Sequence, residues 1–239
     1  MVGTGPGDRA HLSLRADEIL REAEVLVGYH TYLDLVRDYF PGKVEIHSSG
    51  MKREVERARL AVSLARQGYR VAVISGGDPG VYGMAGPVLE LAGAGEEPVE
   101  VEVVPGITAA TAAASTLGAP LMNDFAVISL SDLLTPREVI ERRLEAAARG
   151  DFVVVLYNPA SRRRVDLLPR ARDILLCHRG ADTPAGLVRS CKRGEEQVVI
   201  TSLEKLGEEK VDMLTTVIVG NSQTVVVNGR MVTRRGYAI

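Results

Sequence analysis

The chain of 239 residues has 46% hydrophobic and 25% charged residues, a balance typical of a globular protein with one large or two modest domains. Its formal net charge of -2 and its lack of tryptophan argue against a non-specific nucleic-acid binder, which needs a basic surface or stacking aromatic side chains. There is no secretory signal pattern and no apolar run of about 18 residues, so we expect a cytoplasmic protein that does not span a membrane.

The chain opens with a glycine-rich loop, Gly3-Thr4-Gly5-Pro6-Gly7-Asp8. Gly3 and Gly5 match the first two positions of the dinucleotide-binding pattern G-x-G-x-x-G. The third position is Asp8, whose carboxylate would stand where that pattern needs close helix packing beside an anionic pyrophosphate. The mismatch argues against a dinucleotide site, and the absence of a G-K-[ST] triplet excludes a P-loop.

The next predicted elements alternate between helices and strands. Ser13 is a suitable N-cap for a helix over 14–23, and a strand is predicted at 25–27. Apolar residues then recur at helical spacing over 54–66, and the apolar run at 71–74 indicates a buried strand. This alternation is typical of βα units and a parallel sheet.

A loop over 75–84 follows that strand directly and is the clearest candidate for a ligand site. Its glycines and Pro79 end the strand and let backbone groups approach a ligand without interference from Cβ atoms. In open α/β sheets, ligands bind at the carboxyl ends of parallel strands. The alternative interpretation is an ordinary turn, in which Asp78 only caps the following helix.

A third loop follows a strand predicted over 101–104. It runs through Pro105-Gly106-Ile107-Thr108 into an alanine-rich helix that ends at Leu117. Gly118 and Pro120 prevent this helix from continuing, so we place a domain boundary here. The predicted domains are an N-terminal α/β domain over 1–119 and a C-terminal α/β domain over 120–239.

The second half of the chain contains more strands. We expect strands over 125–130, 152–156, 187–189, 198–201, 217–219 and 225–227, and helices over 137–148 and 165–176. From about residue 197 the strands follow one another closely, which favours a sheet with antiparallel edges. The predicted fold class is therefore α/β, with a mainly parallel first sheet and a mixed second sheet.

Neither the cysteines nor the histidines show metal-ligand spacing. Cys177 and Cys191 are far apart and without a neighbouring histidine pair, and we interpret both as buried thiols. The four histidines, His30 among them, are interpreted as ordinary solvated or core side chains. We therefore expect no metal site.

Four further stretches carry more specific information. They are Ser48-Ser49-Gly50-Met51, Asp124 to Pro136, Leu156-Tyr157-Asn158-Pro159 and Val219-Gly220-Asn221-Ser222. Together with the three glycine loops, they make nearly the whole chain resemble the class III S-adenosylmethionine-dependent methyltransferases that act on tetrapyrroles. The 124–136 stretch is similar to the branch that methylates C(17) of precorrin-3B or cobalt-factor III and contracts the macrocycle in cobalamin biosynthesis.

This resemblance implies a homodimeric enzyme that binds S-adenosylmethionine in a cleft between its two domains and a tetrapyrrole as substrate. Methyl transfer to an electron-rich carbon needs alignment of the reactants and no nucleophilic side chain. The implied cofactor contacts, mostly through the backbone, are Pro6, Gly76, Gly77, Asp78, Val81, Met84, Thr108, Ala109, Tyr157, Asn158, Thr215 and Thr216.

The substrate of the resembled enzymes carries many carboxylates, so we expect cationic side chains around it. The candidates are Lys52, Arg53, Arg162, Arg163, Arg164 and Arg189, although the run 162–164 is equally typical of a solvated helix start. Ring contraction also needs proton transfer, for which Ser129, Asp132, Thr135 and His30 are candidates. Asp132 is equally suited to capping the helix after Pro136.

Three alternatives stay open. The chain could act at a different ring position as another class III methyltransferase, it could bind a nucleoside without catalysis, or its loops could be ordinary turns without cofactor affinity. Members of the resembled family usually have several strand residues before the first glycine loop, whereas only Met1 and Val2 precede Gly3. Either the first strand is short or the true start lies upstream.

Overall fold

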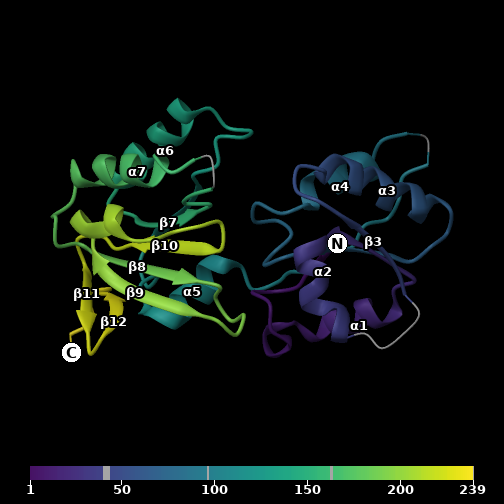
Figure 1. The fold of residues 1–239 in the computed structure, drawn as a ribbon, viewed down its shortest axis with the longest axis horizontal. Coiled ribbons are helices and arrows are strands. Elements are labelled where there is room, and N and C mark those ends of the chain that lie inside the picture. The colour runs from purple at the N-terminus through teal and green to yellow at the C-terminus, as the bar shows by residue number, and fades with distance from the viewer. Residues whose placement is uncertain (40–43, 96, 162–163, 239) are drawn as a thin grey trace. The chain divides into compact units, whose positions relative to one another are not determined.

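The computed structural model describes residues 1–39, 44–95, 97–161 and 164–238. The chain forms two units, Met1–Ala109 and Ala110–Ile239, coloured purple to teal and teal to yellow in Figure 1. The division falls after Ala109, whereas the sequence placed a boundary after Ala119. The reason is helix α5 (Ala109–Leu117), whose buried alanines pack into a core shared with strands of the second unit.

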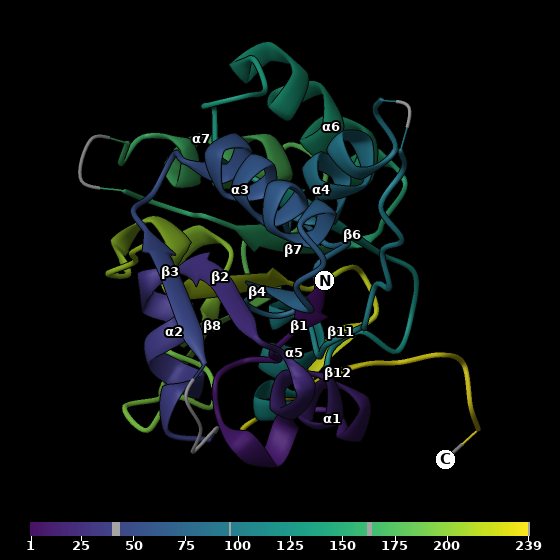
Figure 2. The same cartoon turned by 90° about the vertical axis from the view of Figure 1, so that its right-hand side faces the viewer.

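Unit 1 is built on a parallel sheet with the strand order β1-β4-β2-β3. Side chains alternate along its strands, so Leu26 points to one face while Val25 and Val27 point to the other. Helices α1 and α2 cover the first face and α3 and α4 cover the second (Figure 2). The elements are β1 (Val2–Gly3), η1 (Arg9–His11), α1 (Leu14–Glu22), β2 (Val25–Tyr29), α2 (His30–Val36), η2 (Arg37–Tyr39), β3 (Glu45–Ser49), α3 (Glu54–Arg66), β4 (Val71–Ser75) and α4 (Ala85–Ala92).

Unit 2 contains a mixed sheet with the strand order β6-β7-β10-β8-β9, in which only the β6 and β7 pair is parallel. Helices α6 and α7 pack on one face of this sheet, and α5 packs on the other. A smaller sheet, β11-β12-β5, completes the unit. The elements are β5 (Gly118–Ala119), β6 (Phe125–Ser129), α6 (Arg137–Arg149), β7 (Val153–Tyr157), α7 (Leu167–Leu176), β8 (Pro184–Arg189), β9 (Gln197–Ser202), η3 (Glu204–Glu208), β10 (Thr215–Val219), β11 (Thr224–Val227) and β12 (Arg230–Thr233).

The predicted fold class is confirmed, with a parallel first sheet and a mixed second sheet. The strand predicted over 101–104 is wrong. Val104 alone forms an isolated bridge, to Val2, while Val103 is 40% exposed and Glu102 pairs with Arg15 at the surface. Across the described ranges, no helix combines the length and apolar character needed to cross a membrane.

Candidate functional site

Three loops meet in unit 1 at the edge where its parallel strands end. We call residues 3–8, 76–84 and 105–109 the loop cluster. Gly5 and Gly77 exchange two backbone hydrogen bonds, of 3.1 and 2.8 Å, and Thr4 N donates to Ser75 O at 3.0 Å. The first two loops are therefore joined main chain to main chain.

Asp78 joins the second loop to the third. Its Oδ2 accepts a hydrogen bond of 3.0 Å from Gly106 N, and its Oδ1 accepts one of 2.8 Å from Gly80 N. Helix α4 begins at Ala85 with Met84 at its N-cap position and no side-chain cap. The interpretation of Asp78 as a helix cap is therefore wrong, because its carboxylate ties two loops together instead.

Glycine is required where these loops touch. A Cβ on Gly3 would lie 2.7 Å from Gly106 N and 2.8 Å from Gly77 O, which is closer than a real Cβ approaches such atoms. Gly77 has a φ of +68°, in the left-handed region that residues with a side chain rarely adopt. The close contact between the three loops therefore depends on glycine at these positions.

The structure brings the unit 1 cofactor candidates together in the loop cluster. Pro6 and Met84 are buried there, while the others are half-buried: Gly76, Gly77, Asp78, Val81, Thr108 and Ala109. The ring of Tyr32 lies against Gly76, where an added Cβ would come within 2.6 Å of it. This loop and ring contact was not expected from the sequence.

Other candidates of unit 1 lie at the same sheet edge, after β2 and β3. His30 is exposed at the start of α2, with its ring centroid 4.3 Å from that of Tyr29. Lys52 and Arg53 are exposed, and Arg53 Nη1 lies 3.5 Å from Glu56 Oε2. Both are accessible to an anionic ligand.

Sequence reasoning missed Arg57, which lies on the buried face of α3. Its Nη1 donates to Ser49 Oγ at 3.0 Å and to Gly50 O at 2.8 Å. Arg57 thereby holds the Ser48 to Met51 stretch against helix α3. The sequence carried little signal for this, because Arg57 and the exposed Arg59 both flank the apolar helical position Ala58.

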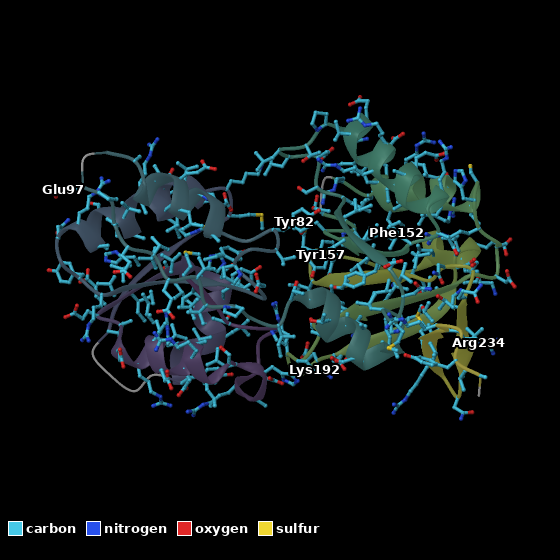
Figure 3. The ribbon with its side chains drawn as sticks, turned by 180° about the vertical axis from the view of Figure 1, so that it is seen from behind. Tyr82, Glu97, Phe152, Tyr157, Lys192 and Arg234 are labelled. Atoms are coloured by element: carbon cyan, nitrogen blue, oxygen red, sulfur yellow. The ribbon has the colours of Figure 1, made fainter. Side chains whose placement is uncertain are left out.

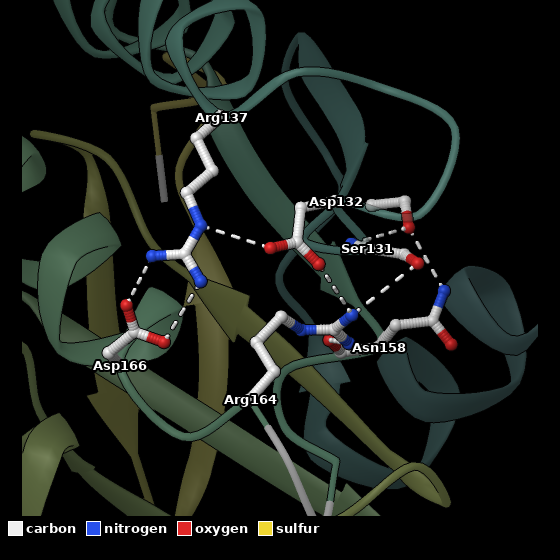
Figure 4. A network of polar contacts seen from close by, with 7 residues as sticks. Ser131, Asp132, Arg137, Asn158, Arg164 and Asp166 are labelled. Atoms are coloured by element: carbon white, nitrogen blue, oxygen red, sulfur yellow. Dashed lines mark hydrogen bonds and ion pairs between the residues drawn. The ribbon is translucent and has the colours of Figure 1, made fainter.

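In unit 2, the ends of β6 and β7 are linked by a group of side chains that we call the polar network: Ser129, Ser131, Asp132, Arg137, Asn158, Arg164 and Asp166 (Figure 4). Asn158 Nδ2 donates to Ser129 Oγ at 2.9 Å. Because β6 and β7 are parallel, both residues stand at the same edge of the sheet. Two site candidates from separate motifs, Asn158 and Ser129, are thus in direct contact.

Asp132 lies between two arginines of the polar network. Arg137 Nε donates to Asp132 Oδ2 at 3.0 Å, and Arg164 Nη1 donates to Asp132 Oδ1 at 3.4 Å. The hydrogen bond from Arg137, with a smaller contribution from Arg164, holds the pKa of the Asp132 carboxyl below its usual value. A carboxyl with a lowered pKa is a poor proton donor and also a weak base near neutral pH, so the geometry favours a charge anchor over an acid–base role for Asp132.

Tyr157 ends β7, and Phe152 lies just before its first residue (Figure 3). The Tyr157 hydroxyl oxygen accepts a 2.7 Å hydrogen bond from Ala110 N in the first turn of α5. Thr215 and Thr216 stand at the same end of the sheet, because Val217 of antiparallel β10 pairs with Leu156. Both threonines are buried.

The remaining candidates have different surroundings. Arg189 Nε donates to Asp212 Oδ2 at 2.8 Å, and the Arg189 side chain is half-buried. Arg162 and Arg163 lie outside the described residues. The Val219 to Ser222 stretch is at the opposite end of β10 from Thr215, where Asn221 Nδ2 donates to Asp151 O at 3.0 Å. That stretch has a structural role in the fold.

A cavity of about 310 Å³ also lies in unit 1, but at the other edge of the sheet. Its lining includes Met1, Val71 and Val101, near the amino ends of the strands and away from the loop cluster. Among the described residues, no group of three histidine, cysteine, aspartate or glutamate side chains is arranged to hold a metal ion. Cys191 is buried as expected, whereas Cys177 is exposed, which corrects its interpretation as a buried thiol.

Comparison with known proteins connects this geometry to a family. The model of the tetrapyrrole (corrin/porphyrin) methylases matches residues 1–207. A probable cobalt-factor III C(17)-methyltransferase of Salmonella typhimurium is 50% identical over 239 residues, which cover 100% of this chain and 99% of that protein.

Two solved structures are similar over most of the chain. The methyltransferase CobJ is 37% identical, with a TM-score of 0.91 over 98% of each chain. The uroporphyrin-III C-methyltransferase of Thermus thermophilus, solved with S-adenosyl homocysteine, is 29% identical, with a TM-score of 0.68 over 92% of this chain and 90% of that one. From the family match and the full-length identity, the chain belongs to the tetrapyrrole (corrin/porphyrin) methylase family.

Proposed function

We propose that this protein transfers a methyl group from S-adenosylmethionine to C(17) of cobalt-factor III or precorrin-3B, with contraction of the ring, in cobalamin biosynthesis. The observation that carries the proposal is 50% identity to a probable cobalt-factor III C(17)-methyltransferase over the whole chain. The matched length includes the segments that form the loop cluster and the polar network. Activity at a different ring position is the alternative within the same family.

The loop cluster is suited to the cofactor. Both carboxylate oxygens of Asp78 accept hydrogen bonds from the backbone N–H groups of Gly80 and Gly106. A ligand would therefore meet mainly main-chain donors and acceptors in the loop cluster. A Cβ on Gly77 would stand at an ordinary contact distance of 3.6 Å from Thr108 Cα, so a branched side chain there would project beside the third loop. The similar structure solved with S-adenosyl homocysteine supports the same ligand class here. We assign the unit 1 contacts to the loop cluster and the unit 2 contacts to Tyr157, Asn158, Thr215 and Thr216.

The main contribution of the protein to methyl transfer is to align the cofactor and the substrate. S-adenosylmethionine held by the loop cluster would supply an electrophilic methyl group on its sulfonium, and transfer of that methyl group to the substrate carbon would release S-adenosylhomocysteine. Correct alignment of two bound reactants lowers such a barrier by up to roughly 7–11 kcal/mol. The rigid, main-chain-bonded loops of unit 1 and the cross-linked strand ends of unit 2 are suited to hold that geometry.

Binding of the tetrapyrrole carboxylates requires cationic side chains, and ring contraction requires a side chain that transfers a proton. Lys52 and Arg53 are exposed at the carboxyl edge of the unit 1 sheet and are proposed to pair with substrate carboxylates. Arg189 retains donors beyond its bond to Asp212 and is proposed for the same role. Ser129 and His30 are the proposed acid–base side chains for ring contraction.

Incubation of the purified protein with ¹³C-methyl S-adenosylmethionine and cobalt-factor III or precorrin-3B tests this proposal. We expect a methylated, ring-contracted product by mass spectrometry, with the label at C(17) by NMR. A label at another ring carbon would favour the alternative. Binding of S-adenosyl homocysteine without transfer to any tetrapyrrole would favour a nucleoside-binding protein.

We also propose a homodimer in the cytoplasm. Exposed valines on β9 and β11, among them Val198, Val199, Val226 and Val227, provide apolar surface for a second copy. Light scattering should give twice the mass of the 25.7 kDa chain. A monomeric mass over a wide concentration range would contradict the assembly and leave the proposed chemistry intact.

A further inference from the structure

Arg164 is the most enclosed charged side chain of the polar network. The residue is 8% exposed, and its backbone is held by reciprocal hydrogen bonds with Ser161, of 2.8 and 3.2 Å. The guanidinium donates to Asn158 O at 2.9 Å and to Ser131 Oγ and Asp132 Oδ1, both at 3.4 Å (Figure 4). Both Nη nitrogens of the guanidinium therefore donate to acceptors of the protein.

These acceptors come from two separate segments. Asn158 follows β7, whereas Ser131 and Asp132 follow β6, and the two strands are parallel neighbours. Asn158 also has a φ of +52° and reaches Ser129 Oγ with its side-chain amide. Ser131 N in turn donates to Ser129 Oγ at 3.2 Å. The contacts close a ring from Arg164 through Asn158, Ser129 and Ser131 back to Arg164.

We infer that Arg164 is a positioning residue that fixes Asn158 and the 129–132 segment relative to each other, and that it does not bind the substrate. The inference rests on the proposed function and replaces the expectation that Arg164 pairs with substrate carboxylates. Burial leaves the guanidinium little access to a large ligand. A planar guanidinium with several donors can hold three acceptors at once, whereas the compact ammonium of lysine cannot reproduce that fork.

The surrounding charges make this burial tolerable. Asp132 is shared between Arg164 and Arg137, and Arg137 also pairs with Asp166. Two cations therefore face two carboxylates within the network. Removal of the Arg164 charge would deprive Asp132 of one of its two ion-pair partners. A variant that keeps the positive charge is therefore needed to separate the effect of positioning from the effect of charge.

The test compares Arg164→Lys and Arg164→Gln with Arg170→Gln in the full-length protein. Arg170 is a surface control, because it also pairs with a carboxylate, Glu141 at 2.8 Å, but lies outside the polar network. We expect Arg164→Lys to lower kcat for methyl transfer by about 10- to 100-fold with little change in KM for the tetrapyrrole, as expected from misplaced reacting groups. Arg164→Gln should lose at least as much, and Arg170→Gln should stay close to wild type.

The opposite kinetic split would overturn the inference. A raised tetrapyrrole KM with unchanged kcat in Arg164→Lys would identify a substrate ligand. Wild-type kinetics in Arg164→Lys would remove any role in positioning, and loss of its folded state would make Arg164 a stability residue only. If Arg164→Gln alone fails to fold, Arg164→Lys decides the question.

A readout without turnover separates this inference from the proposed function. The NMR resonances of the Asn158 side-chain amide should shift in Arg164→Lys and stay in place in Arg170→Gln. Should the wild type transfer no methyl group, the proposed function fails while these resonances still report on positioning. Unmoved Asn158 resonances in Arg164→Lys would contradict the inference whatever the reaction.

Discussion

The loop cluster of unit 1 and the polar network of unit 2 hold their segments together by different means. The loop cluster relies on backbone hydrogen bonds and on the absence of side chains, as between Gly5 and Gly77. The polar network relies on side chains, with Arg164 and Asp132 at its centre. Substitutions in the first region should therefore act through steric exclusion and strain, and substitutions in the second through charge and geometry in a graded way.

The largest effect is expected from Gly77→Val. A β-branched residue at a φ of +68° is strained by roughly 1–3 kcal/mol, and its side chain would occupy the space beside Thr108. We expect no measurable binding of S-adenosyl homocysteine by calorimetry, with the fold retained by circular dichroism.

Gly68→Val is the matched control for this change. Gly68 also has a positive φ, of +94°, but lies at the end of α3 with open space around it. It should show similar backbone strain and normal ligand affinity. Equal affinity in both variants would mean that the loop over 76–84 is only a turn.

The next effect is expected from Ser129→Ala. If the hydroxyl moves a proton during ring contraction, its removal should slow formation of the contracted product by roughly 10²–10⁴-fold. Methyl transfer and cofactor affinity should change much less, which product analysis by mass spectrometry over time would reveal. A normal rate of contraction would move the acid–base role to His30 or to the substrate itself.

A smaller effect is expected from Asp78→Asn. An amide can replace only one of the two acceptor oxygens that bind Gly80 N and Gly106 N, and hydrogen bonds to charged groups contribute about 1.5–3 kcal/mol. We expect a lower Tm and a roughly tenfold weaker affinity for S-adenosyl homocysteine. An unchanged Tm would show that the second and third loops are held by other contacts.

The smallest effect concerns pH and Asp132. Its folded pKa lies below the unfolded value of about 3.9, first through Arg137, so ionised Asp132 stabilises the fold above that pH. This contribution is lost as the pH falls through the folded pKa. The Tm of the wild type should therefore drop more steeply below about pH 4 than that of Asp132→Asn, and parallel curves would contradict a stabilising ion pair.

The two regions also differ in how far the sequence predicts them. Glycine and proline after an apolar run are local signals, so the loops around Gly77 and Gly106 could be found from the sequence. The polar network could be found only in part. Arg137 and Asp166 become neighbours through the packing of α6 and α7, which no spacing in the chain encodes.

Two strand predictions illustrate the same limit. β3 was missed because Glu45–Ser49 is mostly exposed and lacks an apolar alternation. The valines at 101–104 suggested a strand, yet only Val104 finds a partner in Val2. Pairing with a neighbour, and not the propensity of the segment alone, decides both cases.

Titration with S-adenosyl homocysteine by calorimetry tests the central claim most directly, when wild type, Gly77→Val and Ser129→Ala are compared under one condition. The main chain of the loop cluster is proposed to hold most of the cofactor, with Asn158 as the one contact from the polar network, whereas Ser129 is proposed to act only in the reaction. We therefore expect wild type and Ser129→Ala to bind the ligand with similar affinity and Gly77→Val not to bind it. Absence of binding to the wild type, or equal affinity in all three proteins, would contradict this assignment.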